Sequence, residues 1–266
     1  MQLRPGMRAF VTGASRGIGA ALARELAGGG LVVGLAARSA PELEALVAQL
    51  PGSGHVALEC DVASRDSVEA AMSRFVDEAG GLDLLVANAG ITHYEPFARA
   101  PVEAAERMTQ VNWLGTVYTV HAGLTPLLAQ GSGHVVVVSS GAALRSFPSA
   151  AVYGATKAAQ RAFAEALRHE LHGTGVSLTT VYPGEIATSL HDHEKDRMPS
   201  WYRGGPDAAS AEVLARAIVA AVDADARAVY HPPIVRLLGI LNSTVPRGAD
   251  ALLRRLRGAA AAPRRD

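Results

Sequence analysis

The sequence predicts an α/β protein, built on a single doubly wound parallel seven-stranded sheet (Rossmann-type) flanked by helices, with a substrate lid and an extra C-terminal helical tail. Short, nearly continuous apolar runs alternate with longer segments of helical spacing. Strands that are apolar on both faces need helices on both faces, which is the arrangement of a parallel sheet. No Pro/Gly-rich linker or internal repeat divides the 266 residues, so we expect residues 1–266 to form one domain.

Seven apolar runs have the length and composition of buried strands. They are Ala9–Thr12, Leu31–Ala36, Val56–Cys60, Leu82–Ala87, His134–Ser139, Val176–Val181 and Arg227–Tyr230. The segments with helical spacing are Gly17–Ala27, Pro41–Leu50, Ser64–Glu78, Val102–Leu128, Ala151–His172 and Ser210–Val222. Two helix starts carry a capping signal: Ser39 with Glu42 matches a capping box, and Ser64 is a candidate N-cap.

Two regions interrupt the alternation. Residues 185–209 are polar and too long for an ordinary connection, which indicates a lid over the substrate. Residues 231–266 form a C-terminal extension, with an apolar segment at Ile234–Leu241 and a basic amphipathic one around Leu252–Leu256. We expect this extension to pack on the body or on a second subunit. Contact with an anionic membrane surface is the alternative.

Composition excludes several classes of protein. Hydrophobic residues make up 49% and charged residues 19%, enough apolar material for a substantial core. The 25 basic residues balance 25 acidic ones, which argues against a nucleic-acid binder. The single cysteine, Cys60, excludes an internal disulfide and a thiolate zinc cage, and it fits a reducing compartment. With neither a signal peptide nor a spanning segment in the sequence, we expect a cytoplasmic protein.

A glycine-rich turn, Thr12–Gly19, follows the first predicted strand and opens the first predicted helix. Such a turn aims free helix N–H groups and the positive end of the helix dipole at an anion, as in dinucleotide sites. The same residues fit the G-x-S-x-G pattern of the α/β-hydrolases, with Ser15 as nucleophile. In that alternative, His169, His172 or His231 would serve as the base.

The residues after the second strand favour NADP(H) over NAD(H). An NAD site would place an acidic residue about 20 residues after the glycine turn, where it holds the ribose hydroxyls. The matching stretch, Leu35–Ser39, has no carboxylate. Arg38 offers a guanidinium that suits a 2′-phosphate, and Arg16 in the glycine turn offers a second cation.

A tyrosine and a lysine stand at helical spacing near the start of the segment Ala151–His172. Tyr153 and Lys157 are four residues apart and share a helix face. A nearby ammonium stabilises phenolate, so the pair could lower the tyrosine pKa and make it a proton donor and acceptor near neutral pH. Ser140 lies at the end of a predicted strand, where parallel α/β sheets bind ligands.

Together these motifs resemble the short-chain dehydrogenase/reductase family, in its single-domain branch. The similarity covers residues 8 to about 230, and its motifs are in the family's order. The family's serine usually stands thirteen residues before the tyrosine, which selects Ser140 over Ser139. The motifs are the T-G-x-x-x-G-x-G turn (Gly13, Gly17, Gly19), Asp61-Val62, Asn88-Ala89-Gly90, Asn112, Ser139-Ser140, Tyr153 with Lys157, and Pro183-Gly184 with Thr188.

The resemblance implies a role for each of four catalytic residues. Tyr153 is the general acid/base on the substrate oxygen, and Lys157 lowers its pKa and binds the nicotinamide ribose. Ser140 polarises the carbonyl or alcohol, and Asn112 holds a water that links Lys157 to solvent.

The resemblance also implies which residues bind the cofactor. Asp61 and Val62 contact adenine, Asn88-Ala89-Gly90 lines the adenosine side, and the loop from Pro183 positions the nicotinamide carboxamide. Family members pair through two long helices, here Val102–Leu128 and Ala151–His172, so we expect a homodimer or homotetramer. The full predicted cofactor set is Gly13, Ser15, Arg16, Gly17, Ile18, Gly19, Arg38, Asp61, Val62, Asn88, Ala89, Gly90, Tyr153, Lys157, Pro183, Gly184, Ile186 and Thr188.

Other polar and aromatic signals carry less weight. The run His191-Asp192-His193-Glu194 has the chemistry of a metal site, but it falls in the predicted lid and the family's reaction needs no metal, so we predict none. His93 and Tyr94 either line the substrate pocket or lie on a partly exposed loop. Trp201 and Tyr202 are candidates to close over an apolar substrate.

These observations predict an NADP(H)-dependent reductase of a carbonyl compound, or dehydrogenase of the matching secondary alcohol. The aromatic pair Trp201 and Tyr202 in the lid and the apolar segment of the tail favour a hydrophobic, lipid-like substrate. The alternative from another class is a regulatory protein that binds NADP(H) on the same fold without turnover. The hydrolase with Ser15 as nucleophile comes third.

Overall fold

The computed structural model describes residues 1–188, 194 and 208–257. Its main sheet has seven parallel strands in the order β3-β2-β1-β4-β5-β6-β9. The strands are β1 (Arg8–Thr12), β2 (Val32–Ala37), β3 (Val56–Glu59), β4 (Leu84–Ala87), β5 (Gly133–Val138), β6 (Val176–Pro183) and β9 (Ala228–His231). Each lies within two residues of its predicted bounds, so the predicted parallel sheet is confirmed.

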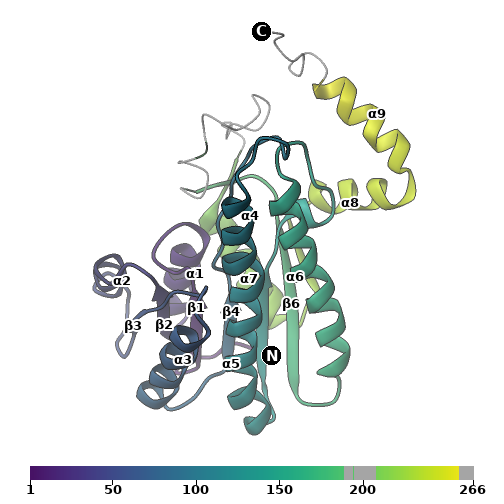
Figure 1. Cartoon of the computed structure of the whole chain (residues 1–266). Helices are drawn as coiled ribbons and strands as arrows, with labels where there is room; N and C mark the ends of the chain where they lie inside the picture. Colours follow the sequence, from purple (N-terminus) through teal and green to yellow (C-terminus); the bar gives the residue numbers. More distant parts are fainter. Residues whose placement is uncertain (189–193, 195–207, 258–266) are drawn as a thin grey trace.

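Helices cover both faces of this sheet (Figure 1). One core cluster joins the sheet to α1 (Gly17–Gly28), α2 (Ala40–Val47) and α7 (Ala211–Asp223). A second cluster on the other face joins it to α3 (Arg65–Ala79), α5 (Gly115–Gln130) and α6 (Ala151–Glu170). Neighbouring residues alternate between the two clusters: the side chain of Phe10 belongs to the second and that of Val11 to the first. The apolar strands are therefore buried on both faces, as the doubly wound prediction requires.

The strand order places a ligand crevice between β1 and β4. The chain builds the sheet outward from β1 to β3, then crosses back and builds the other half from β4 onward. Helices consequently leave the two halves on opposite faces, and the carboxyl ends of β1 and β4 are left open. Open α/β sheets bind ligands at this point.

Two predictions about helices need correction. The segment Val102–Leu128 is not one regular α-helix: α4 (Val102–Met108) is followed by a π-helical turn, η1 (Thr109–Leu114), and then by α5. Ser39 precedes α2, but its side chain makes no capping hydrogen bond. Pro41, at the second position of the helix, removes one of the two N–H groups that an N-cap side chain can reach.

The other N-cap prediction is confirmed. The side-chain oxygen of Ser64 accepts a hydrogen bond from the backbone N–H of Ser67 at 3.3 Å, at the start of α3. The C-terminal end of this helix is closed by Gly80, in the left-handed conformation with φ of +75°.

The predicted lid lies mostly outside the described residues. Its two ends form a short parallel pair, β7 (Ile186–Ala187) with β8 (Ala209–Ser210). Within it the structure describes Glu194 as a buried residue. The predicted lid residues His191, Asp192, His193, Trp201 and Tyr202 lie outside the described part of the chain.

The C-terminal extension forms two helices, α8 (Ile234–Thr244) and α9 (Pro246–Arg257). They project from the body of the molecule beyond the upper end of α6 (Figure 1). Among the helices that the structure describes, none is long and apolar enough to cross a bilayer.

A buried histidine on β5 is expected to make the fold sensitive to acid. His134 is fully buried, its Nε2 lies 2.8 Å from Thr179 Oγ1, and its Nδ1 has no hydrogen-bond partner. Burial lowers its pKa to about 4, and the carboxylate of Asp225 only partly opposes this shift. Because the unfolded chain binds this proton more readily than the folded one, the contribution to stability is complete above pH 6.5 and is lost as the pH falls toward 4.

We therefore expect the free energy of unfolding to fall by about 2 kcal/mol between pH 7 and pH 5 through this residue alone. Urea denaturation at the two pH values measures the difference. His134→Gln should flatten this part of the pH dependence, whereas the control His169→Gln, at an exposed position, should not. An unchanged pH dependence in His134→Gln would contradict the assignment.

Candidate active site

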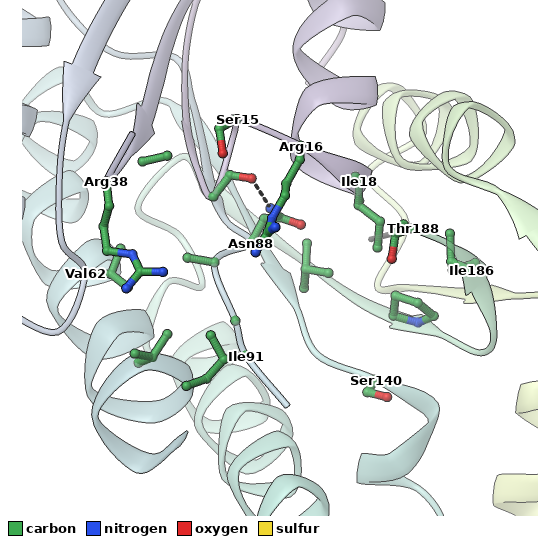
Figure 2. Close-up of a pocket in the computed structure, with 18 of the residues that line it drawn as sticks. Ser15, Arg16, Ile18, Arg38, Val62, Asn88, Ile91, Ser140, Ile186 and Thr188 are labelled. Carbon is green, nitrogen blue, oxygen red and sulfur yellow. Dashed lines mark hydrogen bonds between the residues drawn. The ribbon is translucent and has the colours of Figure 1, made fainter. Parts of the chain in front are cut away.

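A cavity of about 390 Å³ opens at the carboxyl ends of the central strands (Figure 2). Of the twenty residues predicted for catalysis or cofactor binding, all except Gly19 and Asn112 line it. Figure 2 shows Arg38 and Val62 toward one end of this cavity and Ser140 toward the other, with the glycine turn between them. The sequence prediction missed several lining residues, namely Ala37, Ser39, Glu42, Cys60, Ile91, Val111, Val138 and Ser139.

The backbone conformation and close packing of the glycine turn leave no room for side chains at its glycines. Gly13 and Gly17 have φ of +66° and +58°, a region that other residues rarely adopt. A Cβ on Gly19 would lie 2.2 Å from the Gly13 carbonyl oxygen, so Gly19 acts beneath the cavity by allowing this close approach. The turn leads directly into α1, whose first N–H groups have no partner within the helix and are suited to hold a phosphate.

Thr12 and Asn88 join the turn to β4. The Thr12 hydroxyl accepts hydrogen bonds from the backbone N–H groups of Asn88 (3.0 Å) and Ala89 (3.2 Å), and donates to the Val86 carbonyl (3.3 Å). The Asn88 side-chain amide donates to the carbonyls of Thr12 (2.9 Å) and Gly13 (3.3 Å). This network fixes the carboxyl ends of β1 and β4 at the crevice. The sequence motif includes Thr12 but does not explain this role.

Two cations and one carboxylate line the cavity: Arg38 and Glu42 follow β2, and Arg16 lies in the glycine turn. Arg16 and Arg38 are exposed, and neither forms an ion pair with any described residue. Glu42, in the first turn of α2, also lines the cavity. The residues at the end of β2 include no carboxylate, but the helix that follows brings Glu42 to the cavity.

The part of the cavity wall that is predicted to contact adenine is formed by the residues that follow β3. Asp61 Oδ1 accepts a hydrogen bond from Ala63 N–H at 3.0 Å, and Asp61 Oδ2 lies 3.5 Å from Arg107 Nη2. Cys60 also lines the cavity. Burial raises the pKa of its thiol to about 11, so this side chain is an unreactive part of the cavity wall.

The four predicted catalytic side chains come from three elements around the far end of the cavity. Ser140 follows β5 and begins a 3₁₀ turn, η2 (Gly141–Ala143), where its Oγ accepts a hydrogen bond from Ala142 N–H at 3.1 Å. Tyr153 and Lys157 lie on the first turns of α6, and both are buried. The Lys157 ammonium is 6.0 Å from the centre of the Tyr153 ring and donates to the Val138 carbonyl at 3.1 Å.

The two serines after β5 have different neighbours. The Ser139 hydroxyl donates to the backbone carbonyl of Lys157 at 2.8 Å, so it ties β5 to α6. Ser140 is half-buried, lines the cavity and shares a hydrogen bond with the Tyr153 side chain. Ser140 is therefore the serine that is free to reach a ligand together with Tyr153.

Burial controls the pKa values of the tyrosine and the lysine. It raises the pKa of the Tyr153 phenol, and the hydrogen bond with Ser140 acts in the opposite direction. Burial also lowers the pKa of Lys157 to about 7. The predicted lowering of the tyrosine pKa by the lysine is thus not present in this structure, because both groups are removed from water and Lys157 donates to a carbonyl instead.

Asn112 lies in the π-helical turn η1 and holds the segment after β4. Its side-chain oxygen accepts from Ile91 N–H (2.8 Å), and its amide donates to the Ile91 carbonyl (3.0 Å) and to Thr156 Oγ1 (3.1 Å). A Cβ on Gly90 would lie 3.4 Å from both Asn112 Oδ1 and Lys157 Nζ. Asn112 therefore stands beside Lys157, behind the cavity wall.

Tyr94 is a neighbour of the site. From the sequence, it could either line the substrate pocket or lie on a partly exposed loop. It is fully buried, and its ring contacts the edge of the Tyr153 ring at 6.0 Å between centroids. Its backbone N–H donates to the Glu194 carboxylate at 3.0 Å, and His93 Nδ1 lies 3.2 Å from the same carboxylate. Neither His93 nor Tyr94 lines the cavity, and Tyr94 instead packs against Tyr153.

The geometry does not support Ser15 as a hydrolytic nucleophile. His169 and His172 are exposed at and beyond the far end of α6, about 24 Å along the helix from Tyr153. His231 ends β9, which is four strands from β1 and so about 19 Å away. None of the three histidines proposed as the base can reach Ser15.

Sequence comparisons find reductases and oxidoreductases. A family model described as short chain dehydrogenase matches residues 7–199. A glycine betaine reductase from Emericella nidulans is 41% identical over 187 residues, which are 70% of this chain but only 15% of that protein. An uncharacterized oxidoreductase from Myxococcus xanthus is 39% identical over 193 residues, which cover 72% of this chain and 76% of that protein.

Solved structures with the same fold hold nicotinamide dinucleotides. A short chain dehydrogenase from Burkholderia cenocepacia in complex with NADP has a TM-score of 0.82 and 28% identity, covering 95% of this chain and 99% of its own. A short chain dehydrogenase/reductase from Burkholderia phymatum in complex with NAD has a TM-score of 0.85, covering 93% of this chain and 96% of its own. At 24% identity, the second structure supports the fold alone.

Proposed function

This chain belongs to the short-chain dehydrogenase/reductase family, and we propose that it is an NADP(H)-dependent oxidoreductase acting on a hydrophobic carbonyl compound or its secondary alcohol. The observation that carries the proposal is the content of one cavity. Tyr153, Lys157 and Ser140 stand at one end of it, and Arg38 stands toward the other with no ion pair among the described residues.

The cavity fits a nicotinamide dinucleotide in its shape and polar groups. Its volume of about 390 Å³ lies within the range of cofactor sites. The close approach of Gly19 to Gly13 and the free N–H groups of α1 suit the pyrophosphate. Arg38 and Arg16 suit the 2′-phosphate of NADP(H), and the loop of Pro183, Gly184, Ile186 and Thr188 would hold the nicotinamide end.

Within this proposal the bound cofactor supplies or accepts the hydride, and the protein handles the proton. The Tyr153 hydroxyl donates a proton to the substrate oxygen in reduction and removes it in oxidation. The Ser140 hydroxyl donates a hydrogen bond to the same oxygen and holds it beside Tyr153. Lys157 binds the ribose and, with its low pKa, exchanges the proton onward, while Asn112 positions the backbone beside it.

The apolar surroundings of Tyr153 favour a hydrophobic substrate. Tyr153 shares a cluster with Tyr94, Met108, Ala142 and Ala150, and all five are buried. A polar substrate would lose its hydration at this wall without regaining hydrogen bonds. We also propose that the protein forms a homodimer or homotetramer through the helical segments α4–α5 and α6.

The proposal is tested by titrating the purified protein with NADPH and, separately, with NADH, following cofactor fluorescence. We expect NADPH to bind about tenfold tighter or more, because a charge-assisted contact to its 2′-phosphate has no equivalent in NADH. A screen of apolar ketones and aldehydes with NADPH should then show turnover.

Two results would contradict this proposal. A preference for NADH would overturn the cofactor assignment but keep the oxidoreductase. Tight binding of NADPH with no turnover of any carbonyl or alcohol would favour the regulatory alternative, in which the protein only senses the cofactor.

A further inference from the structure

Helix α8 is fixed to the catalytic end of the molecule through one of its faces. Val235 is buried, and a Cβ on Gly141 or Gly184 would lie 3.1 Å or 3.0 Å from its side chain. One and two turns later, Gly239 packs on Leu144, and the Asn242 amide donates to the Leu144 carbonyl at 2.9 Å. Because these three positions of α8 recur at helical spacing, they define its inward face.

The opposite face of α8 is apolar and open. A helix on the surface of a soluble domain normally presents polar side chains there. This face is instead a contiguous apolar surface, and such surfaces mark sites of interaction. Its exposed side chains are Ile234 (51%), Leu237 (49%), Leu238 (45%), Ile240 (49%) and Leu241 (37%), and Val245 (55%) follows directly.

Helices α8 and α9 together carry a strong positive charge. Residues 234–257 contain five arginines and one aspartate, although the whole chain has a net charge of zero. That aspartate, Asp250, pairs with Arg145 from the segment after Ser140. Arg236, on α8, and Arg247, on α9, are both exposed. The two helices therefore combine exposed apolar side chains with a net positive charge.

The combination of exposed apolar side chains and positive charge indicates which kind of partner binds to this surface. In a symmetric dimer the same patch would meet itself, so two clusters of arginines would be brought together without anionic partners. An anionic lipid surface accepts both components: the apolar side chains enter the acyl boundary and the arginines contact the headgroups. We propose that α8 and α9 dock the protein peripherally on an anionic lipid surface.

Docking through α8 would bring the catalytic end close to the lipid. Val235 contacts both the residue after Ser140 and the Pro183-Gly184 loop, so α8 adjoins the proposed substrate end of the cavity. Figure 1 shows α8 and α9 leaving the body at this end. A hydrophobic substrate dissolved in the bilayer would then have a short path to Tyr153. This last point rests on the proposed function, but the docking does not.

The test is flotation of the full chain with vesicles of phosphatidylcholine alone or mixed with phosphatidylglycerol. We expect the protein to float with the mixed vesicles, to float much less with neutral ones, and to be released in 0.5 M salt, where the screening length is about half its value at 0.15 M. The double variant L237D/L241D should reduce flotation about tenfold or more, because it removes exposed apolar groups without touching the core. The single variant Leu237→Asp is made as well, and its matched control is Val213→Asp, which places the same single charge on an exposed apolar position (41%) of α7.

The outcomes separate this inference from the proposed function, because flotation needs neither cofactor nor turnover. Wild-type protein that stays unbound to mixed vesicles would overturn the docking. So would equal loss in Val213→Asp and Leu237→Asp, because the effect would then be charge alone. If L237D/L241D instead dissociates an oligomer in light scattering and leaves flotation unchanged, a second copy covers α8 and the lipid assignment is wrong.

Discussion

Replacing Tyr153 with Phe is expected to lower kcat by about 10² to 10⁴-fold while NADPH still binds with its wild-type affinity. The substitution removes only the hydroxyl, and the buried ring keeps its edge contact with Tyr94. General acid/base groups contribute rate factors of about 10² to 10⁴, so a loss of this size is expected in kcat. Stopped-flow or steady-state assays with a ketone identified by the screen would measure it.

The matched control for Tyr153→Phe is Tyr182→Phe. Tyr182 is also buried and stacks on Tyr230 at 5.0 Å between centroids, but it does not line the cavity. It should keep full activity. Retained activity in Tyr153→Phe would show that another group moves the proton, and loss of NADPH binding in the same variant would show that the change acts on the site's structure.

Changing Arg38 to Asp is expected to reverse the cofactor preference. A guanidinium–phosphate contact is charge-assisted, and a carboxylate in its place repels the 2′-phosphate. We expect NADPH affinity to fall by about 100-fold, with NADH affinity unchanged or improved, because an acidic residue at this place can bind ribose hydroxyls. Fluorescence titration with both cofactors measures the change directly.

Two further variants sharpen this prediction. Glu42→Gln removes the carboxylate that lines the same cavity and should strengthen NADPH binding several-fold, by removing a like charge. Arg24→Ala, at an exposed position on α1 that does not line the cavity, is the control and should change neither cofactor. If Arg38→Asp lowered the affinity for both cofactors equally, Arg38 would not recognise the 2′-phosphate.

Patterns that depend on near neighbours in the chain could be predicted from the sequence alone. The hydrophobic periodicity and the continuous apolar runs placed the ends of each strand of the main sheet within two residues of their observed positions. This was possible because a strand that is buried on both faces has a distinct composition. The glycine turn and the Tyr153–Lys157 spacing located the cavity, because one strand–turn–helix unit and one helix face fix those groups locally. The structure confirms the predicted parallel sheet and supplies the order of its strands.

Only the tertiary structure decided features that depend on contacts between distant segments. Glu42 enters the cavity because α2 folds back over the end of β2, and Tyr94 supports Tyr153 from a loop 59 residues earlier in the chain. Tyr153 and Lys157 are both buried by the surrounding elements. This burial, and not their four-residue spacing, raises the pKa of the tyrosine and lowers the pKa of the lysine. The sequence revealed that residues 234–257 are apolar and basic, but the fold determined which face of α8 is covered by Leu144 and which is left exposed, because burial depends on the elements that a helix meets in space.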